Sequence, residues 1–142
     1  MNFAGQEVDA AAIFNLDAGI LKLPKFKKVE HRIPPRGIIK GENIEFDLLA
    51  EGEESWLVEV RYRRKPTTLN DVEKFLRKLS KMKGWSRLAG LREGRRLWFF
   101  SRKGFDETAA ARLRELQILH SDFSGFNALC RAVKIGEVPV AD

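Results

Sequence analysis

The chain has 142 residues, of which 44% are hydrophobic and 32% are charged, and its formal net charge is +6. This length and composition are typical of one globular domain, and no apolar run approaches the roughly 18 residues of a membrane helix. The single cysteine excludes an internal disulfide, and the amino terminus lacks the features of a signal peptide. We therefore expect a cytoplasmic protein with no membrane partner, whose positive charge favours a polyanion such as nucleic acid.

The first half of the chain predicts one helix and several strands. Residues 5–18 are rich in alanine and precede Gly19, a residue type that commonly follows the last turn of a helix. Hydrophobic and polar residues alternate after Pro24, which is the pattern of half-buried strands. The predicted strands are residues 25–33, a short one that begins at 38–39 after a turn at 34–37, and the two arms of a hairpin, 44–51 and 56–63.

The second half predicts helices that alternate with one strand. Thr68 and Asp71 resemble a capping box, and apolar residues recur after them at helical spacing as far as Gly84. The strongly apolar run at 95–102 suits a central strand that is buried on both faces. The elements after it are a helix that Asp106 caps and that continues to Leu119, and a shorter helix around 126–133.

This order predicts an α/β domain with a mixed sheet, in which the strand after the crossover helix runs parallel to its neighbour. Trp56 and Tyr62 share one face of the second hairpin strand, and we assign both to the core. Cys130 lies among apolar residues, so we interpret it as a buried filler rather than a nucleophile. His31 and His120 are too isolated in the sequence for a zinc site.

The other face of the hairpin carries charges: Asp47 on the first strand, and Glu59 and Arg61 on the second. A loop of three or five residues places Asp47 directly opposite Glu59, whereas a loop of two or four places the acids on opposite faces. Opposed carboxylates beside a core are destabilising unless one pKa rises, an arginine lies close or a divalent cation binds. On spacing alone, a structural Asp–Glu–Arg cluster is as good an interpretation as a functional site.

An acid in one strand, a short turn and then Glu59-Val60-Arg61 in the next strand resemble the motif of the PD-(D/E)xK nuclease superfamily. The segments EFDLLAEGEESWLVEVRYRRKP and LWFFSRKGF are similar to Mrr-like and Holliday-junction-resolvase-like members, and to nuclease-type domains attached to archaeal-type ATPases. The resemblance covers about residues 25–133. It implies one domain, 1–142, of restriction-endonuclease-like fold: an αβββαβ core whose mixed sheet has an antiparallel hairpin and flanking helices.

The resemblance implies a deoxyribonuclease that depends on Mg²⁺ or Mn²⁺. Asp47 and Glu59 match the family's metal-ligating acids, and together with Arg61 they are the catalytic residues that the resemblance implies. Arg61 takes the place of the usual lysine; it can stabilise a phosphate but is a poor general base, because it stays charged. Two further family positions have open matches: an acid on the first helix, among Glu7, Asp9 and Asp17, and Asn70 in place of a glutamine on the second.

The segment RYRRK places Arg63, Arg64 and Lys65 at the rim of this site, where they suit contacts to DNA phosphates. Three interpretations follow. The first is a metal-dependent DNA endonuclease. The second is a catalytically inactive nuclease-fold module that binds DNA or regulates a larger ATPase-associated protein, with Arg61 neutralising the acids. The third is an interaction protein that forms homodimers through its sheet.

Overall fold

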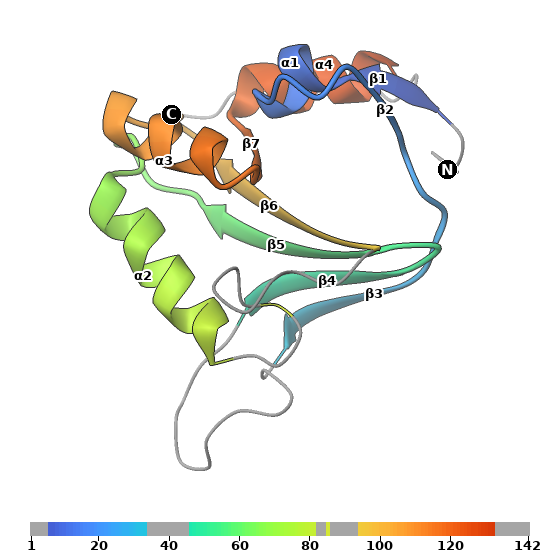
Figure 1. Cartoon of the computed structure of the whole chain (residues 1–142), viewed down its shortest axis with the longest axis horizontal. Helices are drawn as coiled ribbons and strands as arrows, with labels where there is room; N and C mark the ends of the chain where they lie inside the picture. Colours follow the sequence, from blue (N-terminus) through green and yellow to red (C-terminus); the bar gives the residue numbers. More distant parts are fainter. Residues whose placement is uncertain (1–5, 34–45, 82–84, 86–93, 133–142) are drawn as a thin grey trace.

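The computed structural model describes residues 6–33, 46–81, 85 and 94–132, without the side chains of residues 31–33, 46, 47 and 132 (Figure 1). In chain order, the elements are β1 (Glu7–Asp9), α1 (Ala10–Phe14), β2 (Ile20–Lys22), β3 (Phe26–Ile33), β4 (Phe46–Gly52), β5 (Ser55–Arg61), α2 (Leu69–Ser80), β6 (Arg95–Ser101), α3 (Glu107–Glu115), β7 (Leu119–Ser121) and α4 (Phe123–Ala132). The predicted turn at 34–37, the strand beginning at 38–39 and Gly84 lie outside the described residues.

A five-stranded sheet in the order β3-β4-β5-β6-β7 forms the centre of the fold. The strands β3, β4 and β5 are antiparallel, and β6 and β7 run parallel to β5. The predicted mixed sheet of an α/β fold is therefore confirmed, including the parallel strand after the crossover helix α2. A separate two-stranded antiparallel sheet pairs β1 with β2.

The sheet is covered on both faces, so the molecule has three layers (Figure 1). On one face, α2 and α3 bury an apolar cluster that includes Phe75, Phe99 and Leu113. On the other face, β1, α1, β2 and α4 pack around Phe14 and Trp56. Strand β6 contributes to the interior on both sides, as its apolar sequence predicts. Among the described residues, no helix is both long and apolar enough to cross a membrane.

The helices that follow the hairpin begin where their caps predict. The side chain of Thr68 accepts a hydrogen bond from the backbone of Asp71, and the carboxylate of Asp71 accepts one from the backbone of Thr68, which completes the capping box of α2. Asp106 accepts a hydrogen bond from the backbone of Ala109 at 2.8 Å and caps α3. Both predicted N-caps are confirmed.

The prediction of a helix over residues 5–18 is wrong. The helix α1 has only five residues, because Asn15 adopts a left-handed conformation with φ of 54°. The residues before it form β1, where Val8 is buried between exposed neighbours and pairs with the buried Leu21 of β2. Tertiary pairing thus overrides the helix propensity of an alanine-rich segment.

The predicted continuation of the α3 helix to Leu119 is also wrong. The helix ends at Glu115, and Gln117 has a positive φ of 58°, which turns the chain back toward the sheet. Leu119 then begins β7, which pairs with β6. The last helix begins at Phe123 rather than near 126, because the side chain of Asp122 accepts a hydrogen bond from Gly125 at its first turn.

The predicted core residues divide into two groups. Trp56 and Cys130 are buried, as expected. Tyr62 is not: its side chain is 55% exposed, so its assignment to the core is wrong. It lies just beyond the end of β5, where its ring packs on Phe123 at 5.8 Å and stacks against the guanidinium of the buried Arg102 at 4.9 Å.

Candidate functional site

The hairpin register is the one that the loop of three residues predicts. Glu51 pairs with Ser55, and the ladder continues as far as Leu48 opposite Val58. Continued by one residue, this register would set the backbone of Asp47 opposite that of Glu59. The side chain of Asp47 lies outside the described part of the chain.

Glu59 is almost completely buried, with 1% exposure, and two cations contact its carboxylate. Lys78 of α2 donates to both carboxylate oxygens at 2.9 Å, and Nη1 of Arg61 lies 2.8 Å from Oε2. The guanidinium of Arg61 also lies 5.7 Å from the centre of the Phe99 ring. We call the three charged residues Glu59, Arg61 and Lys78 the Glu59 cluster.

The Glu59 cluster holds a buried carboxylate in its charged form. A buried carboxylate is costly unless cations and hydrogen bonds compensate for the lost water, and here both oxygens have charged donors. The side chains of Arg61 and Lys78 keep 25% and 22% exposure, so each remains in contact with solvent on its outer side. The cluster thus contains two positive charges and one negative charge.

Lys78 is the residue that sequence reasoning missed, because it belongs to a basic segment of the kind that usually lies on a solvated surface. Its position carried a signal: it lies three residues after the buried Phe75 and one before the buried Leu79. Residues three apart are neighbours on a helix surface, so Lys78 borders the buried face. Its Nζ lies 6.0 Å from the centre of the Phe75 ring.

The described side chains do not fit a divalent cation at this place. Both oxygens of Glu59 are already bound by Arg61 and Lys78, and no group of three metal-ligating side chains exists within the described ranges. A metal ion needs several oxygen ligands, so it would have to displace at least one of the two cations. The expectation that Asp47 and Glu59 bind Mg²⁺ or Mn²⁺ therefore stays a prediction.

The acids proposed for the first helix lie in the other layer of the molecule. Glu7, Asp9 and Asp17 are exposed, and Asp9 caps α1 by accepting a hydrogen bond from Ala11. Their segment packs on the face that Trp56 shares, which is opposite to the face of Glu59. None of the three reaches the Glu59 cluster.

The proposed substitute for a glutamine on the second helix does not lie at the cluster either. Asn70 is exposed near the beginning of α2, eight residues before Lys78. Eight residues correspond to about 12 Å along a helix axis. Asn70 is therefore at the wrong end of α2 to contact Glu59.

The basic residues that follow β5 differ in their contacts. Arg63 forms an ion pair of 2.8 Å with Asp71, whereas Arg64 and Lys65 are exposed. The loop that follows β6 lies beside this segment, because the backbone of Thr67 donates to the carbonyl of Gly104 at 2.8 Å. That loop contributes the exposed Lys103. We call Arg64, Lys65 and Lys103 the basic rim.

The ion pair of Arg63 also stabilises the fold. Burial acts to raise the pKa of Asp71, but hydrogen bonds from Arg63 and Thr68 outweigh it and lower the pKa from 3.8 to about 2. We therefore expect Asp71→Asn to lower the free energy of unfolding at pH 7 by about 2 kcal/mol. This contribution is present in full above pH 4 and is lost as the pH falls toward 2, because the folded-state pKa is the lower one.

Urea unfolding of the wild type and of Asp71→Asn at several pH values between about 7 and about 2.5 measures this difference. The matched control is Asp17→Asn, which removes an exposed carboxylate and should change stability by only a few tenths of a kcal/mol. A difference between wild type and Asp71→Asn that does not shrink at low pH would contradict the assignment of the lowered pKa.

Comparisons with known proteins give one structural likeness. No family model matches the chain, and no curated protein matches it. A solved structure called "Crystal Structure of Protein of Unknown Function AF1548" is similar, with a TM-score of 0.49 and 19% sequence identity. The similarity covers 68% of this chain and 50% of that one, so this chain spans about half the length of the structure that it matches.

Proposed function

We propose that this chain is a DNA-binding module of restriction-endonuclease-like fold in which the Glu59 cluster has a structural role. The observation that carries the proposal is the contact of both Glu59 oxygens with Lys78 and Arg61. Because both cations contact the acid, the charge of Glu59 is compensated from within the chain. Its role is then to fasten α2 to β5.

The order of the elements supports the fold assignment. A helix is followed by the antiparallel strands β3, β4 and β5, then by α2, and then by β6 parallel to β5. This is the αβββαβ order that the sequence resemblance implies. The remaining elements, β1, β2, α3, β7 and α4, are additions to that order.

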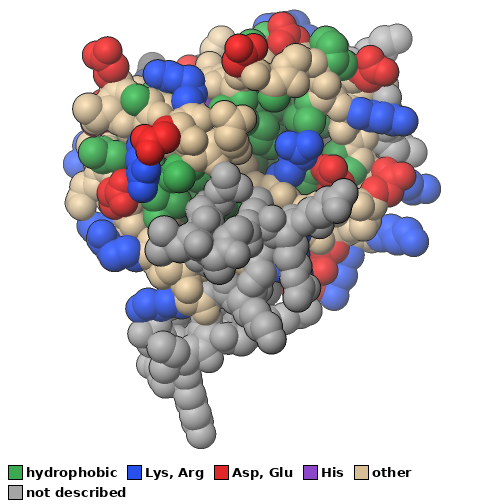
Figure 2. Space-filling model, in the orientation of Figure 1, with side chains coloured by type: hydrophobic (Ala, Val, Ile, Leu, Met, Phe, Trp, Pro, Cys, Tyr) green, Lys and Arg blue, Asp and Glu red, His purple; other side chains and the backbone are tan. Residues whose placement is uncertain are grey.

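The basic rim supports the assignment of DNA as the partner. Arg64 and Lys65 follow β5 and Lys103 follows β6, so all three come after the carboxyl ends of neighbouring parallel strands. Exposed cations suit contacts to phosphate oxygens, which bind the DNA backbone irrespective of sequence. Figure 2 shows that cations on the face in view are interspersed with acids, so this face is not one continuous basic surface.

A metal-dependent DNA endonuclease is the second candidate, and two observations favour it. The hairpin register, continued by one residue, would place Asp47 opposite Glu59, and Lys78 brings to Glu59 the primary amine that is missing at the position of Arg61. In this candidate, Asp47 and Glu59 would hold Mg²⁺ or Mn²⁺ once Glu59 had released a cation. The side chain of Lys78 would then supply the family's lysine from a helix instead of from the strand.

DNA binding at several salt concentrations tests the proposal. We expect the affinity for a duplex of about 20 base pairs to fall with a log–log slope of about −3, as three phosphate contacts would give. The variant Arg64→Gln/Lys65→Gln should weaken binding and reduce the slope by about 2. The matched control is Arg77→Gln, which removes an exposed cation from α2 and should have little effect. Absent binding, or an affinity that does not respond to salt, would overturn the proposal.

The same preparations distinguish the two candidates when Mn²⁺ or Mg²⁺ is added. The binding module should leave plasmid, single-stranded and branched DNA uncut. Cleavage that Asp47→Ala abolishes, with an unchanged unfolding transition, would instead establish the endonuclease. Cleavage that survives Asp47→Ala would indicate a contaminating nuclease, and the binding module would stand.

A further inference from the structure

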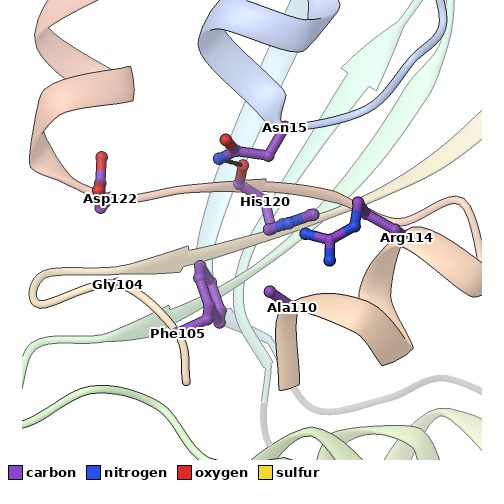
Figure 3. Close-up of a pocket in the computed structure, with 7 residues that line it drawn as sticks. All are labelled: Asn15, Gly104, Phe105, Ala110, Arg114, His120 and Asp122. Atoms are coloured by element: carbon purple, nitrogen blue, oxygen red, sulfur yellow. Dashed lines mark hydrogen bonds between the residues drawn. The ribbon is translucent and has the colours of Figure 1, made fainter. Parts of the chain in front are cut away.

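A second polar site lies at the carboxyl ends of β6 and β7, on the same face of the sheet as Glu59. A hollow of about 170 Å³ is lined there by Asn15, Gly104, Phe105, Ala110, Arg114, His120 and Asp122 (Figure 3). Gly104 follows β6 and Asp122 follows β7. The crevice outside the carboxyl ends of parallel strands is where α/β sheets commonly bind ligands.

His120 gives this hollow a buried hydrogen-bond acceptor. The residue is 1% exposed, and its Nδ1 lies 2.9 Å from the carbonyl oxygen of Ile118. A carbonyl can only accept, so the proton of the neutral ring is on Nδ1 and Nε2 carries a lone pair. Within the described part of the chain, Nε2 has no hydrogen-bond partner.

The surroundings of His120 keep its ring neutral and in place. Burial lowers the pKa of His120, the hydrogen bond to Ile118 acts to raise it, and the charge of Arg114 lowers it further. The amide of Asn15 donates to the backbone carbonyl of His120 at 2.9 Å, and the ring of Phe105 packs edge-on at 5.3 Å. These contacts fix the orientation of the acceptor before any ligand arrives.

Arg114 supplies a positive charge beside this acceptor. In Figure 3 its guanidinium, which comes from α3, lies next to the imidazole of His120, while Asp122 lies at the opposite end of the group. Arg114 is exposed, and the described residues offer it no ion pair. One carboxylate oxygen of Asp122 already has a partner, because its Oδ1 accepts a hydrogen bond from the backbone N–H of Gly125 at 2.9 Å.

We propose that the hollow binds a single phosphate group that retains one proton. An anionic phosphate oxygen would accept from Arg114, and the phosphate O–H would donate to Nε2 of His120. A carboxylate or a sulfate offers the first interaction without the second, because neither carries a proton at neutral pH. A polyphosphate is disfavoured, because it would place a further negative charge near the carboxylate of Asp122. This proposal does not depend on DNA binding at the basic rim.

Phosphate titration of the whole chain, followed by NMR of the histidine rings, tests the proposal. Inorganic phosphate should shift the ring resonances of His120, and sulfate should bind at least about tenfold more weakly. Arg114→Gln should weaken phosphate binding by about tenfold or more. The matched control Arg77→Gln removes an equal charge from another exposed helical position and should leave binding unchanged.

Three results would contradict the phosphate site. Equal binding of phosphate and sulfate, equal loss in the two arginine variants, or unmoved His120 resonances would each overturn the proposal, because attraction to a basic protein would then explain the result. Methyl phosphate, titrated beside inorganic phosphate at about pH 5.5, distinguishes the two sources of the group, because a monoester keeps its proton only below its second pKa of about 6. If it binds as well as inorganic phosphate, the natural ligand is a phosphate monoester; if it binds much more weakly, the ligand is free phosphate.

Discussion

Replacing Lys78 with methionine is expected to lower the free energy of unfolding by about 3 kcal/mol, the lower end of the range for breaking a buried ion pair. Methionine keeps most of the apolar stem that packs near Phe75, so the change mainly removes the charge. Glu59 would stay buried with Arg61 as its remaining cation among the contacts described above. Its Oε1 would then lose the charged donor that Lys78 supplies.

A double-mutant cycle with Glu59→Gln isolates this interaction. Glu59→Gln/Lys78→Met should be less destabilised than the two single variants added together, by about 2 kcal/mol, because the acid that Lys78 neutralises is gone. Urea unfolding provides the free energies. Lys74→Met is the matched control on the exposed side of the same helix and should have little effect. Strictly additive effects would show that the 2.9 Å contacts do not persist in solution.

The same variant bears on the two candidate functions. In the binding module, Lys78→Met should weaken the fold without changing the affinity for DNA under conditions where the protein stays folded. If the chain is an endonuclease, Lys78→Met should abolish the DNA cleavage that depends on Asp47, because Lys78 supplies the amine. Unfolding and cleavage measurements on Lys78→Met therefore test separately whether the Glu59 cluster stabilises the fold and whether it takes part in catalysis.

The sequence predicted the parts of the fold that depend on local patterns. A hairpin loop of three or five residues predicts the observed β4–β5 register, whereas loops of two or four residues, which the sequence left open, do not. The capping box at Thr68 fixed the beginning of α2, and the crossover helix fixed the parallel direction of β6. These features need no knowledge of distant contacts.

The remaining features depend on contacts between distant segments. Lys78 reaches Glu59 across 19 residues of sequence, and the contact depends on the angle at which α2 crosses the sheet. Similarly, β7 has only three residues and follows the left-handed Gln117, so its pattern cannot be separated from that of a continuing helix. The hollow at His120 was missed for the same reason, since it exists only once β7 lies beside β6.

Phe99→Ala is expected to have the largest effect on stability, a loss of about 4 kcal/mol. Phe99 is fully buried, and its ring contacts Phe75 at 5.2 Å and Phe105 at 5.5 Å, edge to face. In the sheet it pairs with Glu59 on one side and His120 on the other. Its ring therefore separates the Glu59 cluster from the proposed phosphate site and supports both.

Urea unfolding of a graded series measures this effect. Phe99→Leu should cost roughly 1 to 2 kcal/mol, because leucine refills much of the cavity that alanine leaves. The matched control is Phe126→Ala on α4, a half-buried ring that contacts Phe100 at 5.5 Å, and it should cost less than half as much as Phe99→Ala. Equal costs for Phe99→Ala and Phe126→Ala would contradict the central place of Phe99. Because Phe105 contacts both Phe99 and His120, Phe99→Ala should also weaken phosphate binding under conditions where the variant remains folded.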